Sequence, residues 1–128
     1  MPTVSQHQGK VEKNRRFLAK IIVADDPEWA ATVAFYIAVH CVEQLRAVAG
    51  HADHWSHTQR LQYVQHFLKP IHGPFTQLYN VSRLARYNTA SDFFRQFSPD
   101  DVTERIIGGW LTAVESYTTT QLANPPSP

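Results

Sequence analysis

The fold of this chain is decided by residues 26–50, which read DPEWAATVAFYIAVHCVEQLRAVAG. The stretch is apolar almost throughout. We expect Asp26 to cap its first turn, Pro27 to occupy the first helical position and Gly50 to end the helix. The pattern therefore predicts one long helix that is largely buried in the core.

Polar side chains interrupt this apolar helix on one side. Tyr36, His40 and Glu43 follow one another at spacings of four and three, which places them on one face of a helix. Residues 75–88 form a second candidate helix with polar and aromatic groups at similar spacing: Tyr79, Arg83, Arg86 and Tyr87. A buried polar group without a partner costs about 1–3 kcal/mol. We therefore expect the two sets either to satisfy each other across the helices or to line a site.

The other long segments also have the pattern of helices, and they cover about residues 5–23, 56–69 and 99–121, with a short piece at 91–97. Ser56 and Ser98 are the expected caps, and Gly73-Pro74 is expected to form a turn. The adjacent glycines at 108–109 are expected to mark a kink or a close contact between helices. The sequence thus predicts an all-α, up-and-down bundle of four to five helices in one domain, residues 1–124, followed by a disordered proline-rich tail at 125–128.

Composition restricts the classes of function. The formal net charge is +1 over 128 residues, so a nucleic-acid site would need local clustering of charge. The one cysteine, Cys41, lies among apolar residues, and we expect it in the core rather than as a nucleophile. Neither a signal peptide nor an apolar window of about 18 residues is visible. We expect a cytoplasmic protein that uses no cofactor and does not contact a membrane.

A run of histidines invites a metal site. His51, His54 and His57 follow one another at a spacing of three. Beyond Asp53, no cysteine or acid at ligand spacing completes the set, and two of the histidines fall in an expected loop. We therefore favour a solvated loop and predict no metal site. A Gly-rich phosphate loop, a nucleophile elbow and a His-Glu-x-x-His motif are also missing from the sequence.

Each polar set has two interpretations. His40, held by Tyr36 and Glu43, could act as an acid or base, or it could be a core histidine satisfied by one hydrogen bond. Arginines beside tyrosines are suited to binding phosphate and stacking bases. Alternatively, Arg83 pairs with Glu43 or another acid, while Arg86 is solvated. The sequence leaves both pairs of alternatives open.

Several segments resemble the HEPN family of small helical proteins. They are PEWAA at 27–31, FYIAVHCVE at 35–43, HTQR at 57–60, Tyr79 and SRLARY at 82–87, and the resemblance covers about residues 11–117. It implies a small helical bundle that is usually dimeric. Many HEPN proteins are metal-independent RNases of toxin–antitoxin or defence systems. Others are non-catalytic partners of minimal nucleotidyltransferases, or nucleotide-binding modules.

The HEPN RNases carry an arginine that is followed, after four to six residues, by a histidine. Arg60 and His66 match this spacing, as do Arg46 and His51. Each of these arginines is followed by an apolar residue where the family commonly has a polar one. The resemblance implies cleavage assisted by the 2′-hydroxyl of RNA, with a histidine moving the proton and an arginine stabilising the phosphate.

Our leading interpretation is a HEPN-like protein associated with RNA or a nucleotide, with a metal-independent RNase as the activity if it is an enzyme. The candidate catalytic residues are His40, Arg60 and His66, and the candidate substrate-binding residues are Tyr36, His57, Tyr79, Arg83, Arg86 and Tyr87. The expected partners are a second copy of the chain, RNA or a nucleotide, and a nucleotidyltransferase or antitoxin. One alternative is a non-catalytic dimerisation or nucleotidyltransferase-partner module whose polar cluster is structural. Another is a bundle that binds a small molecule near His40 and Arg83.

Overall fold

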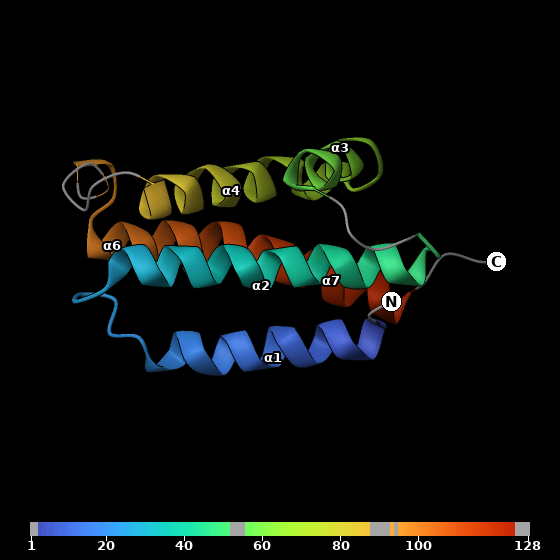
Figure 1. Ribbon diagram of the computed structural model, residues 1–128, viewed down its shortest axis with the longest axis horizontal. Coiled ribbons are helices and arrows are strands. Elements are labelled where there is room, and N and C mark those ends of the chain that lie inside the picture. The colour runs from blue at the N-terminus through green and yellow to red at the C-terminus, as the bar shows by residue number, and fades with distance from the viewer. Residues whose placement is uncertain (1–2, 52–55, 88–92, 94, 125–128) are drawn as a thin grey trace.

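The computed structural model describes residues 3–51, 56–87, 93 and 95–124. Within them every regular element is a helix (Figure 1), namely α1 (Val4–Lys20), α2 (Pro27–Val48), α3 (His57–Phe67), η1 (Lys69–Ile71), α4 (His72–Tyr87), α6 (Pro99–Asp101), η2 (Val102–Leu111) and α7 (Thr112–Ala123). The predicted all-α bundle of four to five helices is confirmed. The expected tail at 125–128, and part of the short piece expected at 91–97, lie outside the described residues.

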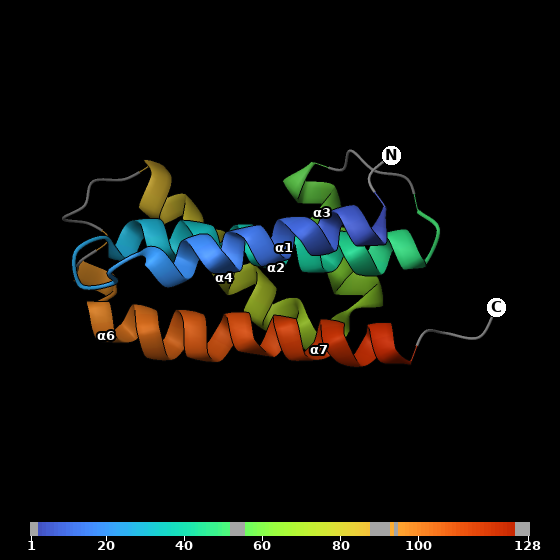
Figure 2. The same cartoon turned by 90° about the horizontal axis from the view of Figure 1, so that it is seen from below.

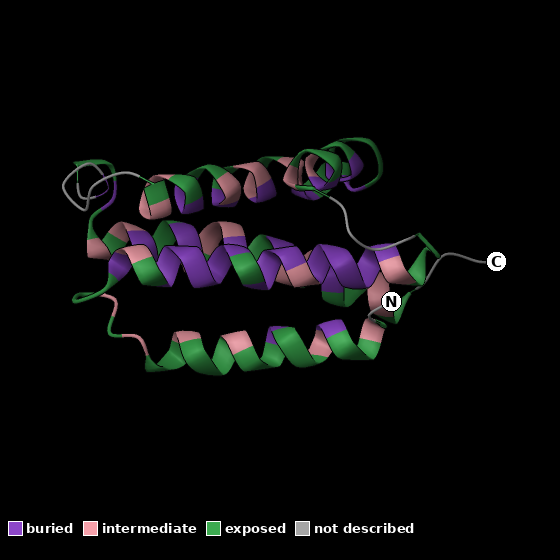
Figure 3. Cartoon of the chain, viewed as in Figure 1, coloured by how far each residue is buried: buried purple, intermediate pink, exposed green. Residues whose placement is uncertain are grey.

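Helix α2 forms the centre of the bundle. In Figure 1 it runs between α1 on one side and α4 on the other, with α7 behind it. Figure 2 shows α6, η2 and α7 as one continuous rod alongside α2. Helices α1, α4, η2 and α7 all contact α2. The burial colours of Figure 3 accordingly make α2 almost entirely buried, which explains why its sequence is apolar on nearly every side.

The helix ends follow local capping chemistry at two of the three expected caps. The Ser56 hydroxyl accepts a hydrogen bond from the Gln59 amide at 3.2 Å, and the Ser98 hydroxyl accepts one from the Asp101 amide at 3.1 Å. In both cases the later side chain bonds back to the serine amide, which completes a capping box. The expectation for Asp26 is wrong in part. It precedes α2, but its side chain makes no capping hydrogen bond.

Two expectations about turns are resolved differently. Gly50 follows α2 with a φ of +83°, a left-handed conformation that favours glycine. Gly73 and Pro74, by contrast, do not form a turn, because they lie in the first turn of α4. Proline is tolerated there, since the first amides of a helix have no partner within the helix. Helix η1 makes the connection from α3 to α4 instead.

The glycine pair at 108–109 does not break the last helix. It lies in η2, a stretch of π-helix that continues directly into α7. A Cβ atom at Gly108 would lie 3.0 Å from the carbonyl oxygen of Thr103. The close contact that the glycines permit is therefore with the preceding turn of their own helix. A close contact with a neighbouring helix, which was one of the two expectations, is not what the glycines provide.

Helix α1 is held to the bundle partly by polar contacts. Its buried residues are His7 and Val11. Gln8 accepts a hydrogen bond from the Gln44 side chain of α2 at 2.5 Å, and an ion pair joins Arg15 to α7. This packing places His7 against the polar side of α2.

Two sequence predictions concern buried and apolar segments. Cys41 is buried, and burial raises the pKa of its thiol to about 12, which confirms its place in the core. Of the helices in the described part of the chain, none combines the length and the apolar character that crossing a bilayer requires.

Candidate functional site

The three polar residues of α2 share one face, but they lie at different depths. Glu43 is buried, with 5% of its surface exposed, whereas Tyr36 is exposed at 38%. His40 lies between them and is partly buried. The predicted face therefore runs from the interior of the bundle to its surface.

Glu43 is the centre of a buried charge network. Its Oε2 accepts a hydrogen bond from Nε of Arg46 at 2.5 Å, and its Oε1 accepts one from Nε of Arg60 at 2.8 Å. Burial acts to raise the pKa of Glu43, but the hydrogen bonds from the two guanidinium groups outweigh it and lower the pKa. Arg46, fully buried, also donates to the backbone carbonyl of His51. The network ties α2 to the start of α3 and to the segment after α2.

His57 extends this network toward the surface. Nη1 of Arg60 lies 3.0 Å from Nδ1 of His57. A guanidinium can only donate, so Nδ1 accepts and the imidazole proton lies on Nε2. Burial, followed by the charges of Arg60 and Arg86, lowers the pKa of His57. The ring packs against Phe35 and Tyr79, with centroid distances of 5.6 Å and 5.4 Å.

His40 pairs with a histidine of α1. The Nδ1 atoms of His7 and His40 lie 3.0 Å apart and share a hydrogen bond. Burial, and then His7, lowers the pKa of His40 to about 4. At neutral pH only about one in a thousand such imidazoles carries a proton. His40 is therefore a poor proton donor at neutral pH, because a general acid works best with a pKa near the working pH.

The three candidate catalytic residues do not form one set. His40 and Arg60 both lie near Glu43, since the charges of Glu43 and Arg60 both act on the pKa of His40. His66 is exposed on α3 and lies in a shallow surface depression with Tyr63 and Phe67. Arg60 faces the other way, toward the buried network.

The histidine run gives no metal site in the described residues. His54 lies outside them. Among the residues that are described, no group of three or more His, Cys, Asp or Glu side chains is arranged to hold a metal ion. The ring of His51 packs edge-on against Tyr63, at a centroid distance of 5.4 Å.

Arg86 joins α4 to α2 at the surface. Its Nη1 donates to the Tyr36 hydroxyl at 3.1 Å, and its Nε donates to the Ser82 carbonyl at 3.2 Å. Its guanidinium carbon lies 5.7 Å from the ring centroid of Tyr36 and 5.2 Å from that of Tyr87. Both distances are within the range of cation–π attraction.

One alternative proposed that Arg83 pairs with Glu43, but in the structure it does not. It is exposed on α4, and its guanidinium carbon lies 5.7 Å from the ring centroid of Tyr79. Arg46 and Arg60 bond to the two carboxylate oxygens of Glu43 instead. Because Arg83 stays at the surface, its charge is exposed to a ligand.

The six candidate substrate-binding residues gather on one surface. Tyr79 contacts both His57 and Arg83, while Arg86 contacts Tyr36 and Tyr87. The ring of Phe35 connects the two halves, because it packs against Tyr36, His57 and Tyr79 at centroid distances of 6.0 Å, 5.6 Å and 5.6 Å. We call this the tyrosine–arginine surface, and its members are Tyr36, His57, Tyr79, Arg83, Arg86 and Tyr87.

Sequence reasoning missed two residues of the site. The sequence suggests a role for Arg46 only through its spacing to His51. In the structure Arg46 is a buried partner of Glu43, which lies three residues earlier on α2. His7 was not singled out, yet it contacts His40. It precedes Val11 by one helical turn, on the side of α1 that faces α2. That spacing was the available signal.

The chain matches no protein-family model, no curated protein and no solved structure. The resemblance to the HEPN family therefore stays a prediction from the sequence.

Proposed function

We propose that this protein binds RNA or a nucleotide through the tyrosine–arginine surface. The observation that carries the proposal is the position of Arg86, which lies against the rings of Tyr36 and Tyr87. Aromatic rings and guanidinium planes are the groups on which unpaired bases stack, and arginine also binds phosphate. The surface thus supplies both kinds of contact that a nucleotide needs.

The local charge supports an anionic ligand. Arg83 and Arg86 carry positive charge, and none of the six residues of the surface is acidic. Glu43, in the neighbouring buried network, is bonded to two arginines, so the network as a whole is not negative. Because the net charge of the chain is only +1, attraction of an anion depends on this local cluster.

The geometry favours binding over cleavage. General acid–base cleavage of RNA needs a histidine that exchanges a proton near neutral pH, next to a cation at the phosphate. His40 has its pKa lowered to about 4, and Arg60 already donates to Glu43 and His57. His66 lies elsewhere on α3.

The buried half of the polar cluster supports the alternative function, a helical module in which these groups are structural. Glu43, Arg46 and Arg60 are buried, and Glu43 bonds to both arginines. Removing one member of such a network leaves a buried charge unpaired, which costs several kcal/mol. The buried network and the exposed surface therefore have separate roles, the first in stability and the second in binding.

The resemblance to HEPN proteins is consistent with this proposal, since that family includes both RNases and non-catalytic nucleotide-binding modules. A homodimer, a toxin–antitoxin or defence setting, and a nucleotidyltransferase or antitoxin partner are further predictions from the resemblance. The homodimer and the partner proteins are assemblies, so each of these is tested with the candidate partner present.

Binding of a labelled single-stranded RNA tests the proposal. Fluorescence anisotropy with EDTA present is expected to show binding by the unchanged protein and at least tenfold weaker binding by Arg83→Gln/Arg86→Gln, since a stacked, charge-paired contact contributes about 1–3 kcal/mol. Arg16→Gln, which removes an exposed arginine of α1, is the matched control and should bind as the unchanged protein does.

Three results bear on the proposal separately. Loss of binding in the arginine variants, with an unchanged helical signal by circular dichroism, supports it. Equal binding by all three proteins overturns the assignment of the surface. Recovery of the RNA intact is expected, and cleavage that persists in EDTA would overturn the choice of binding over catalysis.

A further inference from the structure

A depression lies between the end of α1 and the start of α2. It has a volume of about 430 Å³, and most of the side chains that line it are apolar. Three of these are strongly exposed, with 50% of the surface of Phe17, 64% of that of Ile22 and 58% of that of Trp29 open to solvent. We call this surface the hairpin patch, and its members are Phe17, Lys20, Ile21, Ile22, Asp26 and Trp29.

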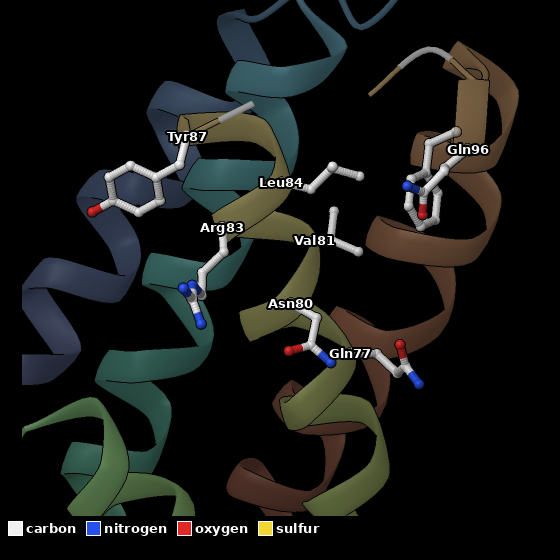
Figure 4. A pocket seen from close by; sticks show the side chains of 8 residues that line it. Gln77, Asn80, Val81, Arg83, Leu84, Tyr87 and Gln96 are labelled. Carbon is white, nitrogen blue, oxygen red and sulfur yellow. The ribbon is translucent and has the colours of Figure 1, made fainter. Parts of the chain in front are cut away.

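The apolar side chains of the hairpin patch indicate that another molecule covers it. Large exposed apolar side chains that gather in one place are typical of interaction surfaces, and tryptophan is enriched among the residues that contribute most to binding. Figure 4 shows a depression of a different kind, beside α4, which is lined by the exposed amides of Gln77, Asn80 and Gln96. Exposed amides form hydrogen bonds with water, whereas the rings and the isoleucines of the hairpin patch do not.

The charged residues of the patch lie on opposite sides of it. Helices α1 and α2 run antiparallel and are joined by residues 21–26, as Figure 1 and Figure 2 both show. Lys20 ends α1 and Asp26 immediately precedes α2. Phe17 and Trp29 each lie three residues farther from the connection, which is about 4.5 Å along a helix. The α1 side of the patch thus carries a cation and a ring, and the α2 side carries an anion and a ring at the same levels.

Such a surface is complementary to a second copy of itself. When a two-fold axis runs along the patch, parallel to the helices, the α1 side of one copy faces the α2 side of the other. Lys20 then meets Asp26 of the second copy, and Phe17 meets its Trp29. The Asp26 side chain makes no capping hydrogen bond to α2, so its carboxylate is available for this contact. RNA, which is uniformly anionic, would instead meet Asp26 unfavourably.

We infer that two copies of this chain pair through the hairpin patch, with α1 of each copy against α2 of the other. This interface goes beyond the proposed function, because RNA binding is assigned to other residues and needs no second copy. A standard interface uses about 20–30 residues on each side, and the hairpin patch has far fewer. We therefore expect a weak, reversible dimer with a dissociation constant of roughly 10–100 μM.

The mass of the protein in solution as a function of its concentration tests the inference. Sedimentation equilibrium should show a monomer at about 1 μM and mostly a dimer at about 500 μM. Trp29→Ser should weaken the dimer at least tenfold, as truncation of a central aromatic residue does. Phe67→Ser removes a comparably exposed ring on α3, so it is the matched control and should pair as the unchanged protein does. Circular dichroism should show the same helix content in all three proteins.

An exchange of charges tests the orientation of the two copies. Lys20→Glu places two carboxylates opposite each other on both sides of the axis, so the dimer should become roughly tenfold weaker. Lys20→Glu/Asp26→Lys restores both ion pairs with their signs reversed, and its affinity should return to within about threefold of the original. Lys13→Glu makes the same change of charge at an exposed position of α1, two turns earlier, and should pair as the unchanged protein does.

Recovery of the dimer in Lys20→Glu/Asp26→Lys is the result that supports the inference most directly. A protein that stays monomeric at the highest concentration overturns it, and uptake of the apolar dye ANS would then assign the patch to a different apolar ligand. A dimer that both Trp29→Ser and Lys20→Glu leave unchanged also overturns it, because the copies then meet elsewhere. Failure of the double variant to recover overturns the pairing of Lys20 with Asp26, and the inference with it. The RNA-binding test of the proposed function stands apart from all of these results.

Discussion

The contact between His40 and His7 makes the stability of the fold depend on pH in a defined range. Burial, and then His7, lowers the pKa of His40 to about 4, against 6.5 for an ordinary histidine. Between these two values the unfolded chain binds a proton at this position that the folded chain excludes. The contribution of His40 to stability is therefore fully present above pH 6.5, and it is lost as the pH falls toward about 4.

The magnitude follows from the width of that range. Each pH unit in which the unfolded state is protonated and the folded state is not costs about 1.4 kcal/mol. Lowering the pH from 7 to 5 crosses about 1.5 such units, so His40 accounts for a loss of about 2 kcal/mol. Burial of His7 and His57 lowers the pKa of each as well, which adds to the loss with the same sign.

Chemical denaturation of the unchanged protein and of His40→Gln isolates the His40 contribution. The glutamine keeps a polar group beside His7 but does not titrate, so the variant should lose about 1–2 kcal/mol less between pH 7 and pH 5. His66→Gln, at an exposed histidine, is the matched control and should follow the unchanged protein. If His40→Gln lost as much stability as the unchanged protein did, the assignment of the pH dependence to this buried pair would be refuted.

Three further predictions concern the buried network, the π-helix and the core thiol. Glu43→Gln removes the charge between two buried guanidinium groups, and denaturation should show a loss of roughly 3 kcal/mol or more; a loss under about 1 kcal/mol would contradict the structural role of the network. Gly108→Ala places a Cβ 3.0 Å from a backbone carbonyl, whereas at Gly109 the distance is 3.4 Å. Gly109→Ala should therefore raise the melting temperature through better helix propensity, whereas Gly108→Ala should not. A melting temperature raised by Gly108→Ala but not by Gly109→Ala would refute the π-helical geometry. Cys41 should resist iodoacetamide in the folded protein and react after denaturation, because it is buried and its pKa is raised to about 12. Mass spectrometry follows the labelling, and rapid labelling of the folded protein would show that the thiol is accessible.

The existence of the helices and several of their ends could be predicted from the sequence. The apolar stretch at 26–50, the serine caps and Gly50 act over one or two helical turns, so neighbouring residues in the chain contain the information. The errors at Asp26 and at Gly73-Pro74 are also local. There the same residue types are compatible with more than one position at a helix start.

The polar face of α2 could be predicted, but its partners could not. Helical spacing places Tyr36, His40 and Glu43 on one side, and the structure confirms that they share a face. Helical spacing within α2 cannot show which arginine reaches Glu43, because Arg60 comes from another helix. Arg83 and Arg60 were equally available in the sequence, and the packing of α3 against the bundle favoured Arg60.

The sequence alone determined an all-α bundle with a buried second helix, because periodicity and capping are properties of adjacent residues. Only the tertiary structure decided that Glu43 belongs to a buried network while Arg83 and Arg86 stay at the surface. The depth of a side chain, and hence its pKa and its availability to a ligand, depends on what other helices bring against it. Contacts between residues such as His7 and His40, or Tyr36 and Arg86, form only when distant segments pack together.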